Sequence, residues 1–201
     1  HYDPETLLAI IDGILSATER QVRQFISDWP DGVFTGESHI DDDGFDSKMI
    51  PIRAEVTIKG DTMKIDLSNS SPQVTGFINS AYANTRSIAH AAIMYLAPYD
   101  VAKNEGSMGP LTVIAPRGLI VNANPPAPVC MSTNHCAEEI IEAVFKALAK
   151  AVPKAVNAGF SRRLRYAITG TDPRTGRYFI WHFFMARGGG GASSGNDGWT
   201  C

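Results

Sequence analysis

The spacing of apolar residues near the start of the chain predicts a long amphipathic helix. Asp3, Pro4 and Glu5 have the residue types of a helix start, because Asp caps the first turn and Pro costs nothing at the first helical position. We expect this helix to end before Pro30 and its apolar face to pack against the rest of the fold. The apolar residues that follow the start recur with the period of a helix and fall mostly on one face: Leu7, Leu8, Ile11, Leu15, Val22, Phe25 and Ile26.

From Gly32 onward the apolar residues recur at every second position, which is typical of strands. Apolar and polar residues alternate over residues 52–58 and again over residues 63–67. Gly60 and Asp61 lie between the two segments and have the residue types of a turn. The pattern therefore predicts an antiparallel hairpin with one solvated face.

A second hairpin is predicted near the end of the chain. Residues 164–168 and 177–184 form its strands, and residues 172–176, Asp-Pro-Arg-Thr-Gly, form a tight turn between them. Short strands are also expected over residues 111–115 and 119–121, on either side of a Pro-Arg-Gly turn.

Two more helices complete the predicted elements. Residues 81–96 and 137–152 carry apolar stripes at helical spacing, and Pro98 and Pro153 end them. Strand pairs thus alternate with single helices, which predicts an α+β fold. We expect antiparallel hairpins or a mixed sheet with three packing helices, formed by residues 1–201 as a single region.

Composition narrows the classes of partner and the compartment. The 201 residues carry a net charge of −3 and the isoelectric point is near 5.9, so no nucleic acid is expected. The longest apolar runs, such as residues 179–185, fall far short of the ~20 residues of a membrane span, so no membrane is expected either. The odd count of 3 cysteines favours a reducing, cytoplasmic compartment.

The two ends of the sequence predict a piece of a longer polypeptide. The chain opens at His1 without an initiator Met and enters a helix within a few residues. It closes on a glycine-rich loop that begins with residues 188–191. We therefore expect an internal fragment of a longer subunit.

Two clusters contain potential metal ligands, but neither has the spacing of a known site. The acidic run of residues 41–43 lacks the alternating ligands and distal Glu of a calcium loop, which favours an Asp-capped turn. Cys130, His135 and Cys136 lack a fourth zinc ligand and the usual Cys-x-x-Cys spacing. We expect no metal ligand in this chain.

The sequence lacks the common catalytic motifs, but several residues and segments are candidates for catalysis or binding. Cys136 beside His135 is either a reactive thiolate at a helix start or, as we favour, a buried structural cysteine. The glycine-rich residues 188–198 form either an anion-binding loop or a mobile connector. Residues 79–86 and 104–106 are polar islands between apolar elements, and each is either a site or a set of capping residues, with capping favoured.

Several ordered segments together resemble the hydantoinase B family, which includes subunits of N-methylhydantoinase, 5-oxoprolinase and the ATP-dependent ketone carboxylases. The resemblance covers essentially the whole chain. Its segments are Trp-Pro-Asp-Gly-Val-Phe-Thr-Gly-Glu at 29–37, the Asp-Asp-Asp-Gly that follows, Asp-Leu-Ser-Asn-Ser-Ser-Pro-Gln-Val-Thr-Gly-Phe-Ile-Asn at 66–79, Asn-Glu-Gly at 104–106, Val-Ile-Ala-Pro at 113–116, Asn-Pro-Pro-Ala at 124–127, Gly-Thr-Asp-Pro-Arg-Thr-Gly at 170–176 and the closing glycine-rich loop.

The resemblance implies a B-type subunit of an ATP-dependent cyclic amide hydrolase, which acts on a substrate phosphorylated by a hydantoinase A-type subunit. It implies partners in that A-type subunit, in the rest of the B-type subunit and in a small-molecule substrate. It also implies ATP with Mg and a divalent metal, Zn or Mn, in the complex, with metal ligands in a region that resembles nothing here. A ketone carboxylase subunit and a catalytically inert scaffold remain alternatives.

Within that resemblance, the catalytic residues are not identified. Residues 133–139, Thr-Asn-His-Cys-Ala-Glu-Glu, depart from the family pattern at a candidate pocket wall, which leaves the substrate open. The candidate substrate-binding residues are Asn79, Arg86, Asn104, Glu105, Gly189 and Gly190.

Overall fold

The computed structural model describes residues 2–159 and 163–200 of the chain. These residues fall into two compact units, one over residues 1–156 and the other over residues 157–201. Helices and predominantly antiparallel strands confirm the α+β class. The expectation that residues 1–201 act as one region of a longer subunit stays a prediction.

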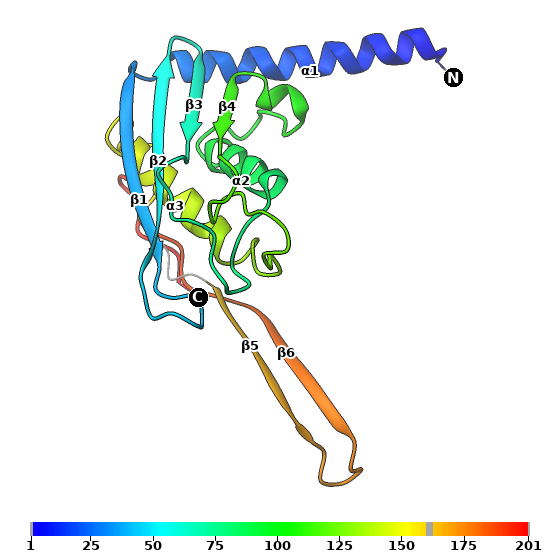
Figure 1. Cartoon of the computed structure of the whole chain (residues 1–201). Helices are drawn as coiled ribbons and strands as arrows, with labels where there is room; N and C mark the ends of the chain where they lie inside the picture. The colour runs from blue at the N-terminus through cyan, green and yellow to red at the C-terminus, as the bar shows by residue number, and fades with distance from the viewer. Residues whose placement is uncertain (1, 160–162, 201) are drawn as a thin grey trace. The chain divides into compact units, whose positions relative to one another are not determined.

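The first unit is built on a four-stranded sheet with the strand order β1-β2-β3-β4 (Figure 1). Its strands are β1 (Gly32–Ile40), β2 (Ile50–Lys59), β3 (Thr62–Asp66) and β4 (Leu111–Ile114). The β2–β3 hairpin predicted from the alternation is confirmed, with Ile58 opposite Met63 and Val56 opposite Ile65. Neighbouring strands are antiparallel except β3 and β4, which are parallel, so the sheet is mixed.

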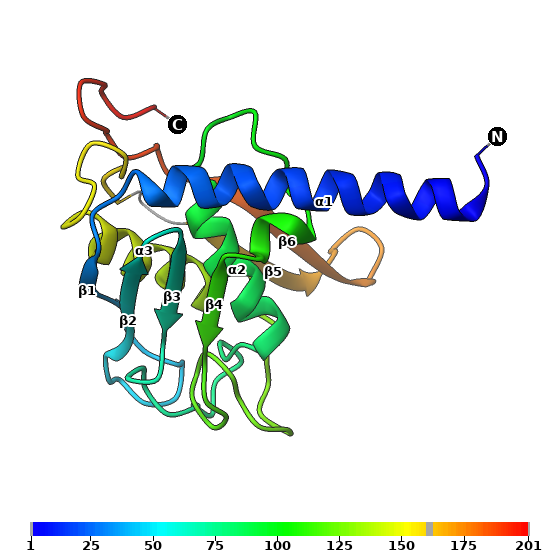
Figure 2. The same ribbon diagram turned by 90° about the horizontal axis from the view of Figure 1, so that it is seen from above.

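Helices α2 (Tyr82–Met94) and α3 (Cys136–Leu148) pack together, and α3 covers β1 and β2 (Figure 2). The helix and strands come unusually close at Gly36, where a Cβ would collide with the carbonyl oxygen of Ala143. The inward positions of β2 and β3 are buried between sheet and helices, whereas the alternate positions form a charged face. The predicted one-sided sheet is therefore confirmed. The largest fully buried side chains of this core include Ile52, Ile58, Met63, Ile65, Leu67, Ile93, Ile120, Ile140 and Leu148.

Helix α1 (Pro4–Ser27) begins and ends as the sequence predicts. The Asp3 carboxylate accepts a hydrogen bond from the Thr6 amide at 2.9 Å, and the helix ends before Pro30. Its C-terminal half buries Val22 and Ile26 in the core, while its N-terminal half extends beyond the sheet (Figures 1 and 2).

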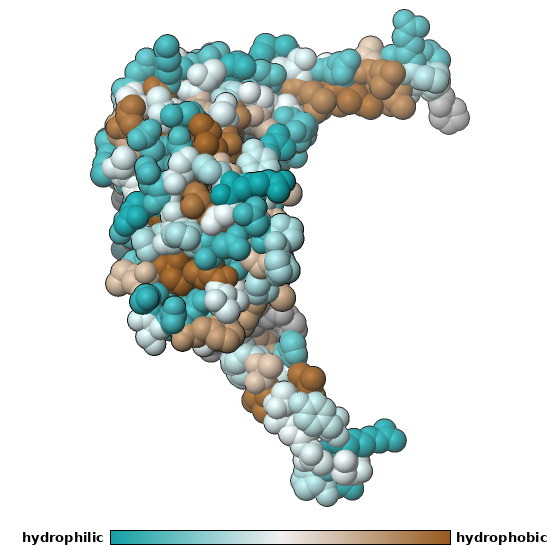
Figure 3. Space-filling view, in the orientation of Figure 1, coloured by the Kyte–Doolittle hydropathy of each residue, from teal (hydrophilic) through white to brown (hydrophobic). Residues whose placement is uncertain are grey.

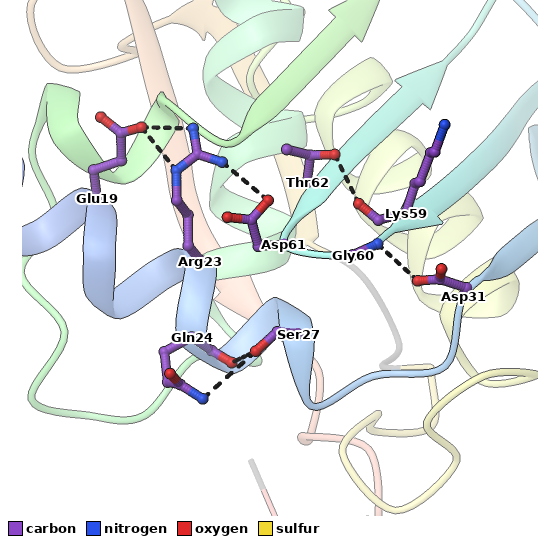
Figure 4. A network of polar contacts seen from close by, with 9 residues as sticks. All are labelled: Glu19, Arg23, Gln24, Ser27, Asp31, Lys59, Gly60, Asp61 and Thr62. Atoms are coloured by element: carbon purple, nitrogen blue, oxygen red, sulfur yellow. Dashed lines mark hydrogen bonds and ion pairs between the residues drawn. The ribbon is translucent and has the colours of Figure 1, made fainter.

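A polar network joins the C-terminal half of α1 to the β2–β3 turn (Figure 4). Arg23 lies 2.6 Å from Glu19 one turn earlier and 3.3 Å from Asp61 in the turn. The Asp31 carboxylate accepts a hydrogen bond from the Gly60 amide at 2.8 Å. These contacts fix the helix across the end of the sheet.

The prediction of a strand over residues 119–121 is wrong. Leu119 forms only isolated bridges to Pro72 and Asn122. Ile120 instead exchanges backbone hydrogen bonds with two loops, donating to Ser71 O at 2.9 Å and accepting from Ser80 N at 2.7 Å. The apolar residues 120 and 121 are buried by these loops, so their burial needs no strand partner.

The second unit contains the hairpin predicted at the end of the chain. Strands β5 (Arg163–Thr171) and β6 (Tyr178–Arg187) pair antiparallel around the turn over 172–176, with Ile168 opposite Trp181. Asp172 caps this turn by accepting a hydrogen bond from the Arg174 amide at 2.9 Å.

Within the parts of the chain that the structure describes, no helix combines the length and the apolar character needed to cross a membrane.

Candidate functional site

Arg86 and Glu105, predicted separately from two polar islands, lie together in the fold. Arg86 is on α2, and Glu105 begins the short 3₁₀ helix η1 (Glu105–Met108). The Arg86 guanidinium donates to a Glu105 carboxylate oxygen at 2.9 Å. Both side chains are largely exposed, at 42% and 68%, so the pair can be reached from solvent. An exposed pair of this kind contributes little to stability and remains free to exchange partners.

Asn104 lies beside this pair and joins η1 to α1. Its Oδ1 accepts a hydrogen bond from the Gly106 amide at 2.9 Å, which makes Asn104 the N-cap of η1. Its Nδ2 donates to the Thr18 hydroxyl of α1 at 2.9 Å. The amide group is thus engaged on both sides within the fold.

His90 and Ser107 extend the same cluster, and the sequence did not single them out. The Ser107 hydroxyl donates to the Asn104 carbonyl at 2.5 Å, so the His90 Nε2 atom, 2.8 Å away, must donate to the Ser107 oxygen. Burial lowers the pKa of His90, the Arg86 charge lowers it further, and Glu105 acts in the opposite direction. Ser107 is fully buried, and its proton points away from His90, so the pair has the geometry of a structural link.

The spacing of Arg86 and His90 was a usable signal for this cluster. Residues four apart on a helix share a face, so these two side chains of α2 had to point toward one neighbour. That neighbour is the Asn104–Ser107 segment, which the sequence marked as polar only through Asn104 and Glu105.

Asn79 is placed elsewhere, in the interior of the first unit. It is fully buried, and its Oδ1 accepts a hydrogen bond from the Val74 amide at 2.8 Å. Its Nδ2 donates to the carbonyls of Val74 at 2.9 Å, Gly76 at 2.9 Å and Pro128 at 3.1 Å. None of these four bonds reaches Arg86, Asn104 or Glu105. A substrate role for Asn79 stays a prediction, and its observed contacts are those of a residue that joins loops.

Gly189 and Gly190 belong to the second unit. A Cβ at Gly189 would collide with the Trp199 carbonyl oxygen, and a Cβ at Gly190 would lie 3.6 Å from the Trp199 Cβ. Gly189 therefore allows close packing against residue 199, whereas a Cβ at Gly190 would be at ordinary contact distance. Their predicted contact with substrate is not tested by this geometry.

The acidic run forms the Asp-capped turn that the sequence favoured. The Asp43 Oδ1 atom accepts hydrogen bonds from the amides of Phe45 at 2.9 Å and Asp46 at 2.8 Å, and its Oδ2 accepts one from Gly76 at 3.1 Å. These donors lower the pKa of Asp43. Among residues 2–159 and 163–200, no three His, Cys, Asp or Glu side chains are arranged to hold a metal ion.

Cys136 is the buried structural cysteine that the sequence favoured over a thiolate. Its side chain is fully buried, and its Sγ lies 3.7 Å from the Ile120 carbonyl. Burial raises the pKa of the thiol strongly, and Glu139 raises it further. The alternative of a reactive thiolate is therefore wrong. Glu138 and Glu139 in the same helical turn are also buried, which their charge did not predict.

A hollow of about 480 Å³ lies beside β1, β2 and the C-terminal half of α3. None of the predicted site residues lines it. Lys146 of α3 and Lys150, just after the end of that helix, flank it opposite Glu37 and Arg53 of the sheet. The Lys150 ammonium donates to the Thr35 carbonyl at 2.6 Å, and Lys146 lies 2.8 Å from Glu142. The two lysine side chains beside the hollow are thus paired with other groups of the protein.

Comparisons with known proteins agree with the fold and with the family resemblance of the sequence. The profile of the hydantoinase B/oxoprolinase family matches residues 1–201. The chain belongs to this family. It is 32% identical over 201 residues to the beta subunit of the caprolactamase of Pseudomonas jessenii, covering 98% of this chain and 34% of that protein. It is 29% identical over 211 residues to the B-type subunit of a putative D-/L-hydantoinase from a Pseudomonas strain, again covering 98% and 34%.

Solved structures extend the comparison to three dimensions. The crystal structure of the ATP-dependent caprolactamase from Pseudomonas jessenii superposes with a TM-score of 0.87 at 31% identity, over 99% of this chain and 35% of that one. A nucleotide-free acetone carboxylase superposes with a TM-score of 0.75 at 17% identity, over 90% of this chain and 26% of that one, and shows the shared fold. The hydantoinase B family member described here thus spans about a third of the length of its curated relatives.

Proposed function

We propose that this sequence forms part of the B-type subunit of an ATP-dependent cyclic amide hydrolase. The observation that carries the proposal is the match to caprolactamase along essentially the whole chain, at 31% identity and a TM-score of 0.87. The hydantoinase relative also acts, by its name, on a cyclic amide. The substrate class proposed here is therefore a lactam, hydantoin or oxoproline ring.

In this proposal an A-type subunit uses ATP with Mg to phosphorylate the amide oxygen, and the B-type subunit completes hydrolysis. Phosphorylation converts a poor electrophile into an activated imidate that water can attack. A divalent metal, Zn or Mn, would supply activation of that water. The described residues offer no set of ligands for it, so the metal would be held by another part of the longer subunit.

Among the side chains that the structure describes, Arg86 is the one we propose to contact an anionic substrate. Its guanidinium is exposed and held by the single carboxylate of Glu105, which a phosphorylated or carboxylated ligand could replace. Asn104 sets the position of Glu105 by capping η1. The proposed roles are substrate contact for Arg86 and positioning for Asn104 and Glu105.

Each of two alternative functions is supported by a different observation. The acetone carboxylase fold supports a ketone carboxylase subunit, in which an enol phosphate would meet bicarbonate. The internal hydrogen bonds of Asn79 and Asn104 support a scaffold whose chemistry lies elsewhere in the subunit.

The proposal is tested with the full-length B-type subunit that carries this sequence, with and without its A-type subunit. Phosphate release from ATP and ring opening are measured with a lactam, a hydantoin and 5-oxoproline, and carboxylation is measured with acetone and bicarbonate. We expect ATP-dependent ring opening only when both subunits are present. Carboxylation without ring opening would favour the carboxylase, and ATP hydrolysis by the B-type subunit alone would contradict the division of labour.

The site assignment is tested in the same assay. Arg86→Ala should lower kcat/KM by about tenfold or more, the scale expected when one positioned hydrogen-bond donor is lost. Arg174→Ala is the matched control, because it also removes an exposed Arg–carboxylate pair, to Asp172 at 3.1 Å. Equal turnover in both variants would favour the scaffold.

A further inference from the structure

The N-terminal half of α1 carries an uncovered apolar face. Leu7, Leu8, Ile10, Ile11 and Ile14 are all exposed, from 42% for Ile10 to 61% for Leu8. Figure 3 shows them as a continuous hydrophobic band along one side of the extended half of the helix. Scattered apolar residues are normal on a surface, but a contiguous group of large aliphatic side chains marks an interaction site.

This band continues the face that α1 buries in the core. Ile11, Leu15 and Val22 follow one another at intervals of four and seven residues, which places them on the same side of the helix. Val22 is fully buried and Leu15 is partly buried, whereas Ile11 is 43% exposed. One stripe is therefore covered at its C-terminal end and open at its N-terminal end.

The part of α1 that η1 covers ends near Leu15. The Gly106 backbone packs so closely on Leu15 that a Cβ would collide with the Leu15 carbonyl, and Asn104 bonds to Thr18. Residues 4–14, before this contact, are all exposed, and the capping bond to Asp3 lies at their N-terminal end. A helical segment of this length is marginally stable in water without tertiary contacts, so a partner surface is required.

Charge and composition indicate the kind of partner. Residues 2–14 include Asp3, Glu5 and Asp12 but no Lys or Arg. A second copy packed on this segment would bring two acidic segments together with no Lys or Arg between them, which is unfavourable. The band consists of Leu and Ile, without the aromatic and Arg anchors that are enriched at interfaces between separate chains, and so has the composition of a protein interior.

We propose that this band is covered by another part of the same B-type subunit, which presents an apolar face flanked by Lys or Arg. This inference rests on the proposed function in one respect, that the sequence belongs to a longer B-type subunit. The relatives support it, because this chain covers only 34% of the beta subunit of caprolactamase and two thirds of such a protein lies elsewhere.

Photo-crosslinking in the full-length subunit identifies the occupant. Benzoylphenylalanine is placed at position 11 on the band or, as a control, at position 9 on the opposite side of the helix. With position 11 we expect an adduct to a peptide of the same chain outside these 201 residues, whether or not the A-type subunit is present. An adduct to the A-type subunit, an adduct to a second copy in an isotope-mixed sample, or no adduct would each overturn the proposal.

Amide hydrogen exchange gives an independent test that does not depend on the crosslinker. Leu8→Gln with Ile11→Gln should speed exchange of the amides of residues 4–14 by about tenfold or more, because the covering contact is lost. Ala9→Gln with Ser16→Gln, which are exposed and face away from the band, should leave exchange unchanged. Equal exchange in the two variants would overturn the proposal. ATP-dependent turnover, measured separately, reports on the proposed function and not on this contact.

Discussion

Single polar side chains hold the loops of the first unit in place, and Asn79 is the main example. Its side chain bonds to the backbone of Val74, Gly76 and Pro128 while fully buried. Asp43 bonds to the Gly76 amide from a distant part of the chain. Residues 74–76 are thus fixed from two sides by side chains rather than by a strand or helix.

Asn79→Ala is expected to destabilise the protein by about 2–3 kcal/mol, because it leaves buried amide and carbonyl groups without a partner. The measurement is the free energy of unfolding in urea. Asn69→Ala, at an exposed position, is the control and should change that free energy by less than about 0.5 kcal/mol. A similar small effect at both positions would show that the loops do not depend on Asn79.

His90 makes stability depend on pH. Its pKa in the folded protein lies below the ordinary 6.5, mainly because of burial, so the unfolded state binds the proton more readily. We therefore expect the contribution of His90 to stability to be greatest above pH 6.5 and to fall as the pH decreases through the window below it.

His90→Gln is expected to reduce this pH dependence, because Gln keeps an N–H donor for Ser107 and cannot be protonated. The test compares the free energy of unfolding at about pH 7.5 and about pH 5.5. The loss on acidification should be smaller in the variant than in the wild type. An equal loss in both would assign the pH dependence to other groups.

At this scale the sequence predicted some residues and not others, for a physical reason. Arg86, Asn104 and Glu105 were singled out because polar residues between apolar elements are conspicuous. The fold places them in one cluster, and their role in a site stays a prediction. Ser107 was missed because only the distance between α2 and η1 reveals a contact across 17 positions. The burial of Glu139 was missed because charge alone predicts exposure.

Among the elements, the close approach of α3 to β1 sets the depth of the core. Gly36 lies opposite Ala54 on β2 and directly beneath the backbone of Ala143 on α3. Helix and strand can meet this closely because residue 36 has no side chain. The backbone of the helix, rather than a flexible side chain, occupies the space that a Cβ would need.

Gly36→Ala should lower the free energy of unfolding by about 1–3 kcal/mol, because α3 must move away from the sheet. Gly13→Ala is the matched control, since nothing lies within 4 Å of a Cβ at that exposed helical position. There the same change should raise the free energy by about 0.4–1 kcal/mol, through lower entropy of the unfolded chain. Thermal unfolding of both variants tests whether the two changes in the free energy of unfolding have opposite signs.

Periodicity explains which elements could be predicted. The stripes of α1 and α3 and the alternation of β2 and β3 are local, and the residue pattern contains them. The pairing of β3 with the distant β4 is not local, and neither is the burial of residues 120 and 121 by loops from residues 71 and 80. Such contacts depend on topology, which a pattern of apolar residues cannot specify.

At the scale of the whole molecule, the second unit has an exposed apolar face, as does the N-terminal half of α1. Cross-strand partners share a face, so Tyr166, Ile168, Phe179, Trp181 and Phe183 lie on one side of the β5–β6 ribbon. Tyr166 stacks on Phe183 at 5.0 Å between ring centroids, and Trp181 meets both edge-on. The other side has a single Phe, Tyr or Trp ring among the residues paired by this register, and carries Ala167, Thr169, Thr171, Tyr178, Ile180 and His182. A two-stranded ribbon is marginally stable alone, and this aromatic face is the side that a further layer would stabilise.

We therefore expect the 201-residue chain on its own to self-associate through the aromatic face of the ribbon, which sedimentation velocity measures over a range of concentrations. Ile168→Thr, on the aromatic face, should weaken this association, because it removes apolar area beside Trp181. Ile180→Thr is the matched control, since it makes the same change on the opposite face of the same ribbon, where the side chain is even more exposed, at 57% against 47%. If exposure alone drove association, Ile180→Thr would weaken it at least as much. A monomeric wild-type chain that binds no apolar dye would contradict the expectation altogether, and would mean that the ribbon is stable without a covering layer.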